Sequence, residues 1–215
     1  MRNRIMARGK RESTNEIAGF GGLYLPIPAI SERLESEKQT RAQSLRALFT
    51  GDYTKEDLLK SSQGGYFGPG NAQLPAPPML MMDRIIEISV DGGEFGKGHV
   101  IGELDITPDL WFFDCHFPGD PVMPGCLGLD AMWQIIGYWL GWSGSQGKGR
   151  AVGVGEVKFR GDIKLDIKRV RYEVSMRQVR RGKLALGIAN GRLFADDTCV
   201  YVAKDMRVGL IASAI

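Results

Sequence analysis

One stretch decides the fold: residues 125–142, GCLGLDAMWQIIGYWLGW, are apolar on nearly every side of a helix. A helix on the surface of a protein keeps one polar face, so this stretch predicts a helix that is buried inside the domain. Its most apolar part is too short to span a bilayer, and it contains Gln134 and Gly137.

Strand patterns lie on both sides of this helix. Residues 84–90 and 95–104 flank Asp91-Gly92-Gly93, which is typical of a β-hairpin. Four more strand-like segments, separated by turn residues, follow Gly149: 151–160, 170–180, 183–194 and 198–210. The pattern predicts an α+β domain in which an antiparallel sheet wraps around the long helix.

Charge divides the chain into two parts. The 215 residues carry 28 Lys or Arg and 25 Asp or Glu, and residues 1–50 hold nine of the basic residues against five Glu. No long apolar segment follows the basic run, so a secretory signal is not expected. We predict that residues 1–50 are a poorly ordered extension with a short helix in 31–49. Residues 51–215 then form the main domain, which begins with a helix at 52–59 capped by Thr54.

The composition narrows the class of protein. With 43% hydrophobic and 25% charged residues, the chain is neither fibrous nor wholly disordered. Three cysteines (Cys115, Cys126 and Cys199) without a CxxC pair indicate reduced thiols rather than a disulfide framework. A cytoplasmic location is therefore predicted, with neither nucleic acid nor a membrane as a partner.

The residues that could take part in a reaction lie in one segment, 111–134, WFFDCHFPGDPVMPGCLGLDAMWQ. His116 lies in an aromatic loop stiffened by Gly and Pro, surroundings that favour the neutral imidazole needed by a general base. Asp130 falls in an apolar helix, so its carboxyl group must be hydrogen-bonded, kept protonated or directed into a cavity. Gln134, one helical turn later, is the candidate partner. The amide of Gly125, at the start of the helix, is a candidate oxyanion donor.

Other interpretations of these residues remain open on the pattern alone. A lone buried histidine or a paired aspartate is more often structural than catalytic. A metal site formed by Cys115, His116 and Cys126 is weaker, because adjacent ligands strain tetrahedral geometry and no second ligand pair stands at zinc spacing. His99 is expected to be an ordinary surface or edge residue of a strand.

Residues 115–134 resemble the active-site segment of the family of bacterial 3-hydroxydecanoyl-acyl-carrier-protein dehydratase/isomerases, and the likeness extends over about 53–215. The resemblance implies a hot-dog fold, in which an antiparallel sheet wraps around a long buried helix. It also implies a homodimer with active sites at the interface, and no metal or organic cofactor.

The resemblance also implies residue roles. His116 would take the proton from C2 of a 3-hydroxyacyl thioester, and Asp130 of the other protomer would protonate the leaving hydroxyl. The Gly125 amide would hold the thioester oxygen, and the Val122 carbonyl would orient the imidazole. Aspartate rather than glutamate at position 130 favours a bifunctional enzyme of unsaturated fatty acid biosynthesis. Such an enzyme also isomerises trans-2-decenoyl to cis-3-decenoyl thioester.

Three alternative functions remain open: a dehydratase without isomerase activity, a non-catalytic hot-dog protein that binds an acyl chain or a partner, and a hot-dog thioesterase. In such a family the substrate arrives on a small acidic acyl carrier protein. A basic cluster around one predicted turn is the candidate docking surface: Arg177, Arg180, Arg181 and Lys183.

Overall fold

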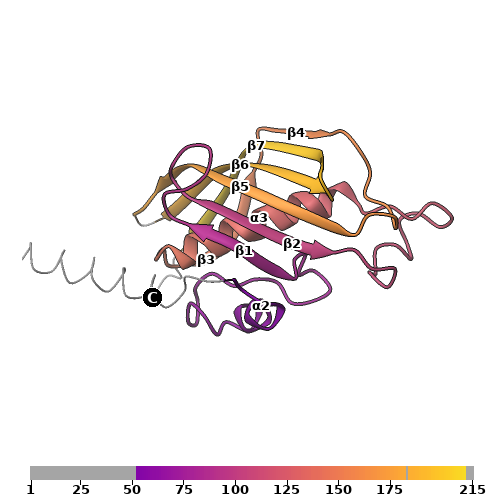
Figure 1. Ribbon diagram of the computed structural model, residues 1–215. Coiled ribbons are helices and arrows are strands. Elements are labelled where there is room, and N and C mark those ends of the chain that lie inside the picture. The colour runs from indigo at the N-terminus through magenta and orange to yellow at the C-terminus, as the bar shows by residue number, and fades with distance from the viewer. Residues whose placement is uncertain (1–51, 183, 212–215) are drawn as a thin grey trace, which may run out of the picture. The chain divides into compact units, whose positions relative to one another are not determined.

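Helix α3, which spans Gly125–Trp142, lies against one face of a seven-stranded antiparallel sheet (Figure 1). The computed structural model describes residues 52–182 and 184–211, all of which belong to one compact unit. The predicted extension 1–50, with its helix, lies outside the described residues. The architecture is the α+β hot-dog fold that the sequence predicts, with the bounds of α3 as expected.

The sheet has the strand order β1-β2-β5-β6-β7-β3, and β4 pairs with β7 off this path. All pairs are antiparallel. The strands are β1 Arg84–Ser89, β2 His99–Asp105, β3 Lys148–Gly153, β4 Glu156–Phe159, β5 Arg169–Arg180, β6 Leu184–Ala195 and β7 Thr198–Ile211. Among the described residues, β1 therefore ends the sheet on one side, and β3 and β4 together end it on the other.

Two strand predictions differ in detail from the structure. The predicted hairpin is confirmed, because β1 pairs with β2, but its connection covers residues 90–98, in which Gly93, Gly96 and Gly98 have positive φ angles. The expected strand 151–160 is divided into β3 and β4, which both pair with β7. The division lies opposite Asp205 of β7, whose φ of 52° interrupts the extended backbone there.

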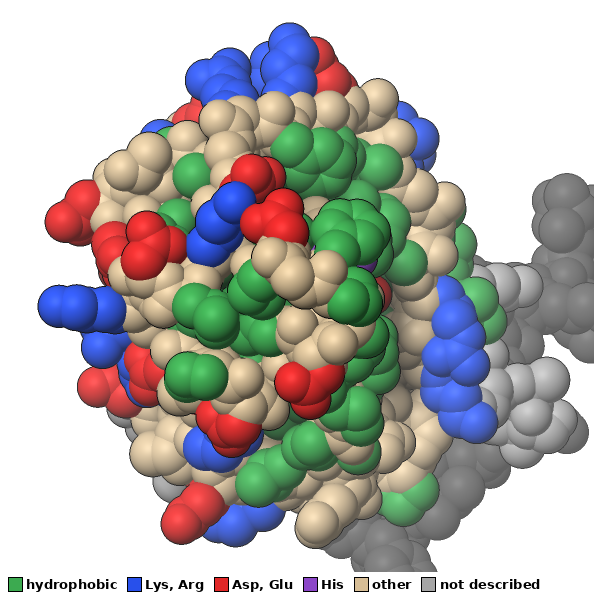
Figure 2. Space-filling model, turned by 90° about the vertical axis from the view of Figure 1, so that its right-hand side faces the viewer, with side chains coloured by type: hydrophobic (Ala, Val, Ile, Leu, Met, Phe, Trp, Pro, Cys, Tyr) green, Lys and Arg blue, Asp and Glu red, His purple; other side chains and the backbone are tan. Residues whose placement is uncertain are grey.

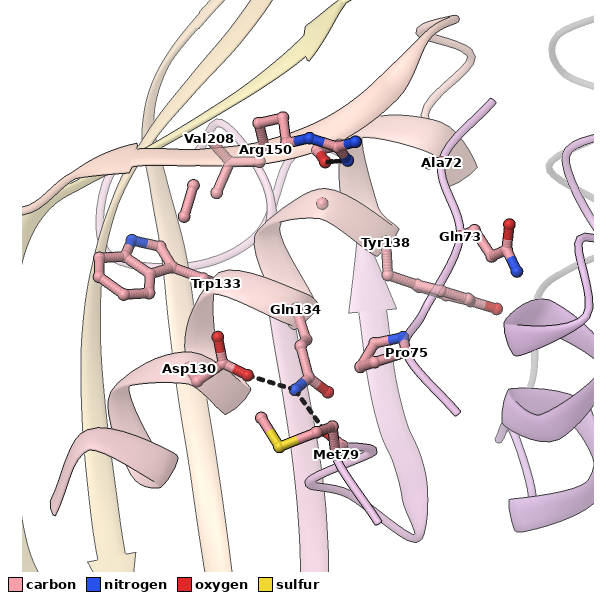
Figure 3. A pocket seen from close by; sticks show the side chains of 13 residues that line it. Ala72, Gln73, Pro75, Met79, Asp130, Trp133, Gln134, Tyr138, Arg150 and Val208 are labelled. Atoms are coloured by element: carbon pink, nitrogen blue, oxygen red, sulfur yellow. Dashed lines mark hydrogen bonds between the residues drawn. The ribbon is translucent and has the colours of Figure 1, made fainter. Parts of the chain in front are cut away.

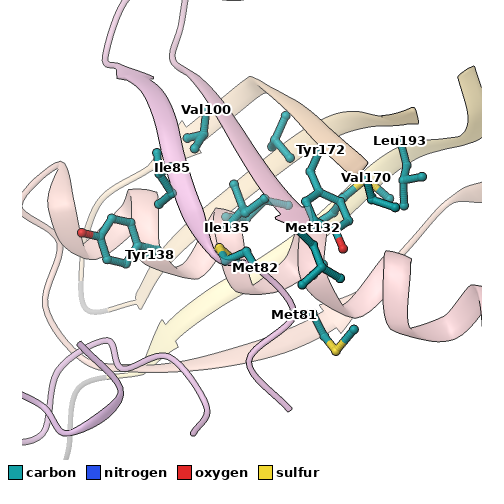
Figure 4. Close-up of a cluster of buried hydrophobic side chains, with 14 of the residues drawn as sticks. Met81, Met82, Ile85, Val100, Met132, Ile135, Tyr138, Val170, Tyr172 and Leu193 are labelled. Atoms are coloured by element: carbon teal, nitrogen blue, oxygen red, sulfur yellow. The ribbon is translucent and has the colours of Figure 1, made fainter. Parts of the chain in front are cut away.

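The core lies between α3 and the concave face of the sheet (Figure 4). Alternate residues of β5 face the helix, and Val170, Tyr172, Val174 and Met176 are all 0% exposed. Burying a large apolar side chain contributes about 1.5–3 kcal/mol, so this face alone stabilises the fold substantially. The predicted alternation of wet and dry faces is confirmed.

Glycines allow the helix to approach the sheet closely. A Cβ atom on Gly98 would lie 2.3 Å from the ring of Trp139, and one on Gly191 would lie 2.5 Å from the sulfur of Met132. The Trp139 indole N–H donates to the Ser89 carbonyl oxygen over 2.7 Å, which holds the ring over Gly98. The close spacing between α3 and the sheet therefore requires glycine at positions 98 and 191, because a larger residue would collide with side chains of the helix.

Helix α2 (Lys55–Ser62) adds a short element beside β1. Thr54 caps it, and its backbone N–H donates to Asp57 Oδ2 over 3.0 Å, which confirms the predicted cap. Tyr53 exchanges backbone hydrogen bonds of 2.8 and 2.9 Å with Ile85 of β1. No helix within the described ranges has the length and apolarity that a bilayer crossing requires.

We expect Gly98→Ala to destabilise the fold far more than Gly96→Ala. Both glycines have positive φ angles, but a Cβ on Gly96 meets only the Asp91 carbonyl oxygen at 3.7 Å. Backbone strain alone should cost about 1–2 kcal/mol at Gly96. At Gly98 the collision with Trp139 should add about 1–3 kcal/mol. Urea unfolding of both variants measures the difference, and equal losses would contradict the role of the Gly98–Trp139 contact.

Candidate active site

His116 lies in a loop that folds back on itself before α3. Phe117 and Asp120 exchange backbone hydrogen bonds of 3.0 and 2.9 Å, and the Val122 N–H donates to the His116 carbonyl oxygen over 2.8 Å. The Met123 N–H donates to the Ile163 carbonyl oxygen over 2.9 Å, which ties the loop to the segment after β4. The backbone around the imidazole is therefore held by hydrogen bonds at both ends.

The imidazole of His116 has one fixed nitrogen. Its Nδ1 lies 2.8 Å from the Val122 carbonyl oxygen, an atom that can only accept. Nδ1 therefore carries the proton, and in the neutral ring Nε2 is left with a lone pair. The ring is half-buried and lies against Phe117, with 3.9 Å between the ring centroids. This is the tautomer that a general base acting through Nε2 requires.

Asp130 lies in the second turn of α3 and is held by Gln134. The Gln134 Nε2 group donates to Asp130 Oδ2 over 2.7 Å and to the Met79 carbonyl oxygen over 2.8 Å (Figure 3). The Gln134 Oε1 atom accepts from the Met81 N–H over 3.3 Å. Both the nitrogen and the oxygen of the Gln134 amide are therefore hydrogen-bonded, and these bonds fix the orientation of the side chain. Because Oδ2 of Asp130 accepts a hydrogen bond, a proton on this carboxyl group would be carried by Oδ1.

Asp130 lines a cavity of about 350 Å³. One face of α3 forms its floor, from Asp130 through Trp133 and Gln134 to Gly137 and Tyr138. The other walls come from residues 72–79, from β3 and from Val208 of β7. In Figure 3 the segment with Pro75 and Met79 lies across the cavity from β3. Most of the lining is apolar, and burial raises the pKa of Tyr138, whose phenol therefore stays neutral.

Within one chain the two candidate catalytic side chains do not share this cavity. His116 and Val122 lie together in the loop, Asp130 and Gln134 lie together on the helix, and His116 does not line the cavity around Asp130. Gly125 is the first residue of α3, so its N–H has no acceptor within the helix. A Cβ on Gly125 would lie 2.8 Å from the Phe159 ring, which explains the glycine.

The loop end of the domain exposes apolar side chains. Phe117 and Phe159 are each 55% exposed, and Leu165 is 44% exposed. Figure 2 views the end of the domain at the right of Figure 1, and apolar side chains gather there between charged ones. Apolar surface gathered in this way is typical of an interaction site.

The predicted basic cluster is held by several partners. Arg177 forms an ion pair with Asp205 on β7, and Arg181 donates to Ser143 Oγ over 3.0 Å at the C-terminal end of α3. Arg180 is exposed at the end of β5, and Lys183 lies outside the described residues. Arg177 therefore bonds to β7, and Arg181 bonds to the C-terminal end of α3.

The other candidate residues named from the sequence are the three cysteines and His99. Cys115 Sγ lies 3.7 and 3.6 Å from the Trp111 and Phe112 carbonyl oxygens, and all three cysteines are free. Nowhere in residues 52–182 and 184–211 do three His, Cys, Asp or Glu side chains gather as metal ligands. His99 lies on β2, an inner strand, where its Nδ1 is 3.1 Å from Glu87 Oε1.

Sequence reasoning missed several residues of the cavity. Trp133 and Gly137 follow Asp130 by three and seven positions, so helical periodicity alone would have placed them on its face. Met79, which lines the cavity, and Met81, which does not, bind Gln134 through backbone atoms more than fifty residues away, and no local pattern predicts such contacts.

A family model described as a FabA-like domain matches residues 74–204. Among solved structures, the chain is similar to the dehydratase heterocomplex ApeI:P from Xenorhabdus doucetiae, at 18% identity and a TM-score of 0.49, over 66% of this chain and 88% of that chain. Cj0977, a sigma28-regulated virulence protein from Campylobacter jejuni, matches at 10% identity and a TM-score of 0.45, over 65% and 82%. The uncharacterized protein PH1136 from Pyrococcus horikoshii matches at 10% identity and 0.46, over 64% and 88%.

Replacing Gln134 should destabilise the domain, whereas Asp130→Asn should not. Gln134→Met keeps the size of the side chain but leaves the Met79 carbonyl and the Met81 N–H without their partner, at a cost of about 1–3 kcal/mol. An asparagine at position 130 still offers an oxygen to Gln134, so its effect should stay within about 0.5 kcal/mol. Urea unfolding compares the two, and a neutral Gln134→Met would show that the amide does not hold the 79–81 segment.

Proposed function

The chain belongs to the FabA-like domain family, and from this premise we propose that it dehydrates 3-hydroxyacyl thioesters to trans-2-enoyl thioesters. The observation that carries the proposal is the 2.8 Å hydrogen bond from His116 Nδ1 to the Val122 carbonyl oxygen, which leaves Nε2 as a base. Asp130, held by Gln134 at the edge of an apolar cavity, supplies the matching acid.

In the proposed reaction His116 Nε2 takes the proton from C2, and negative charge develops on the thioester oxygen. The N–H of Gly125, at the positive end of α3, stabilises that charge. Asp130 Oδ1 then gives its proton to the C3 hydroxyl, the C3–O bond breaks, and water leaves as the C2=C3 bond forms. Return of the proton from the imidazolium to the carboxylate restores both groups, so no co-reactant is consumed.

We further propose that the active unit is a homodimer in which His116 of one protomer meets Asp130 of the partner subunit. Two observations support this assembly. The cavity around Asp130 is not lined by His116 of the same chain, and Phe117, Phe159 and Leu165 expose apolar surface at the loop end of the domain. Burial of such surface is the main favourable contribution to association.

The finer proposal is a bifunctional enzyme of unsaturated fatty acid biosynthesis that prefers chains of about ten carbons. Isomerisation of trans-2-decenoyl to cis-3-decenoyl thioester needs a proton removed at C4 and one returned at C2. One imidazole base in reach of both carbons serves both steps. We place the enzyme in the cytoplasm, where its three free thiols stay reduced. Its substrate is then carried by an acidic acyl carrier protein, for which exposed Arg180 is a docking candidate.

The purified protein should convert 3-hydroxydecanoyl N-acetylcysteamine thioester to trans-2 and cis-3 decenoyl products, separated by chromatography. His116→Ala should lower the formation of both products about 10²–10⁴-fold, because the same base serves both reactions. His99→Ala is the matched control and should keep wild-type rates, since His99 pairs only with Glu87 among the contacts described for its ring.

Each result has a distinct meaning. Release of 3-hydroxydecanoic or decenoic acid would indicate a thioesterase, and binding without turnover would indicate an acyl-binding protein. Only trans-2 product would limit the enzyme to dehydration. If His116→Ala retained either activity near the wild-type rate, the shared base would be wrong.

Mixing two inactive variants should restore activity if the site is shared between protomers. We expect His116→Ala and Asp130→Asn homodimers, refolded together, to regain about a quarter of the wild-type activity. In half of the dimers, one site then combines an intact His116 with an intact Asp130 from different chains. Dimer formation is followed by size-exclusion chromatography with light scattering. A mixture as inactive as its components, with heterodimers demonstrated by differential tags, would place both residues of one site on the same chain.

A further inference from the structure

Helix α3 contains four glycines, at positions 125, 128, 137 and 141. Glycine inside a helix is less favourable than alanine, because it loses more backbone freedom on folding. Each of the four should therefore have a structural or functional reason.

Packing explains three of the four. A Cβ on Gly125 would lie 2.8 Å from the Phe159 ring, and one on Gly128 would lie 2.6 Å from Leu193 Cδ1. A Cβ on Gly141 would lie 2.8 Å from the Cβ of Ala72. All three distances are shorter than real Cβ contacts, so no larger residue fits without a shift of its neighbours.

Gly137 has no such reason among the described residues. The nearest atom to a Cβ at this position is Val208 Cγ1 at 3.8 Å, an ordinary van der Waals contact. An alanine would fit, and the helix would be more stable with it. Gly137 lines the same cavity as Asp130. Because glycine has no side chain, this position leaves space in the cavity.

Gly137 lies on the same face of the helix as Asp130. The two are seven residues apart, which is close to two full turns and about 10 Å along the axis. Trp133 and Gln134 line the cavity between them, and Val208 and Pro75 line it from the other walls. The space therefore runs along the helix from a carboxyl group to a glycine, with a lining that is mostly apolar.

We propose that Gly137 determines the length of the acyl chain that the enzyme accepts. The inference rests on the proposed function, which places C3 of the substrate beside Asp130. From there an extended chain would follow α3 and end over Gly137. With C–C bonds of about 1.5 Å in zigzag, about 10 Å holds about eight carbons beyond C3, which corresponds to a medium chain of about ten to twelve carbons. A side chain at position 137 would close the far end of the cavity.

The test compares chain lengths in the full-length protein. Gly137→Leu should lower kcat/KM for 3-hydroxydecanoyl N-acetylcysteamine thioester by about 10- to 100-fold, the usual effect of altering an apolar pocket. The value for the 3-hydroxybutanoyl thioester should change less than about threefold, because the short chain ends before Gly137. Gly137→Ala should give an intermediate ratio of the two values and should unfold no earlier than wild type on heating.

Gly128→Ala is the matched control. It adds the same methyl group to α3 nine residues earlier, where the Cβ collides with Leu193 and Tyr201, and neither of these residues lines the cavity. It should lower the melting temperature but leave the ratio of decanoyl to butanoyl activity unchanged. A change in that ratio equal to the change in Gly137→Ala would overturn the proposal, because the effect would then come from the helix and not from the cavity.

A binding measurement separates this proposal from the proposed function. Decanoyl and butanoyl N-acetylcysteamine thioesters lack the 3-hydroxyl group and cannot be dehydrated, and their binding can be followed by tryptophan fluorescence, since Trp133 lines the cavity. Gly137→Leu should weaken decanoyl binding selectively, even if the wild-type protein dehydrates nothing. Equal loss for both chain lengths with loss of the dimer would assign the space at Gly137 to the partner subunit. Unchanged decanoyl binding would show that the chain does not reach Gly137.

Discussion

The close packing of α3 against the sheet is the constraint on which the rest of the structure depends. A helix that is apolar on nearly every side is stable only when it is covered, and the concave sheet covers it. Gly98 and Gly191 let the helix approach until its side chains touch the strands. Once the helix is enclosed in this way, Asp130, its one charged residue, needs a polar partner, and Gln134 supplies it.

Local patterns were readable from the sequence, and long-range ones were not. The bounds of α3, the Thr54 cap and the pairing of Asp130 with Gln134 depend on residues within one or two turns of each other, so spacing alone indicates them. The division between β3 and β4 depends on Asp205 of another strand. Gly153 and Gly155 mark this place in the sequence, and a Cβ on Gly155 would lie 3.0 Å from the Cβ of Asp205. The pattern of 151–160 nevertheless predicts a single strand, because the sequence does not show which strand the glycines face.

The site shows the same contrast between local and distant contacts. The bond from His116 to Val122 joins residues six apart in a loop whose Gly and Pro content is visible in the sequence. Each half of the proposed site is oriented by partners from its own chain: a backbone carbonyl holds His116, and a side-chain amide holds Asp130. In the proposed dimer the two groups would therefore meet already oriented, and little reorganisation would be needed during the reaction.

The hydrogen bonds of Gln134 also bear on the order in which the chain assembles. They join α3 to the backbone at Met79 and Met81 across 55 and 53 residues, so this wall of the cavity cannot form before the helix is in place. Closing a loop of this length costs conformational entropy, and these bonds offset that cost only once Gln134 is in place. A partly folded chain can have its strands and its helix and still have no cavity. The proposed capacity to hold an acyl chain would therefore be a property of the finished fold, and incomplete molecules would present apolar surface without a place for the substrate.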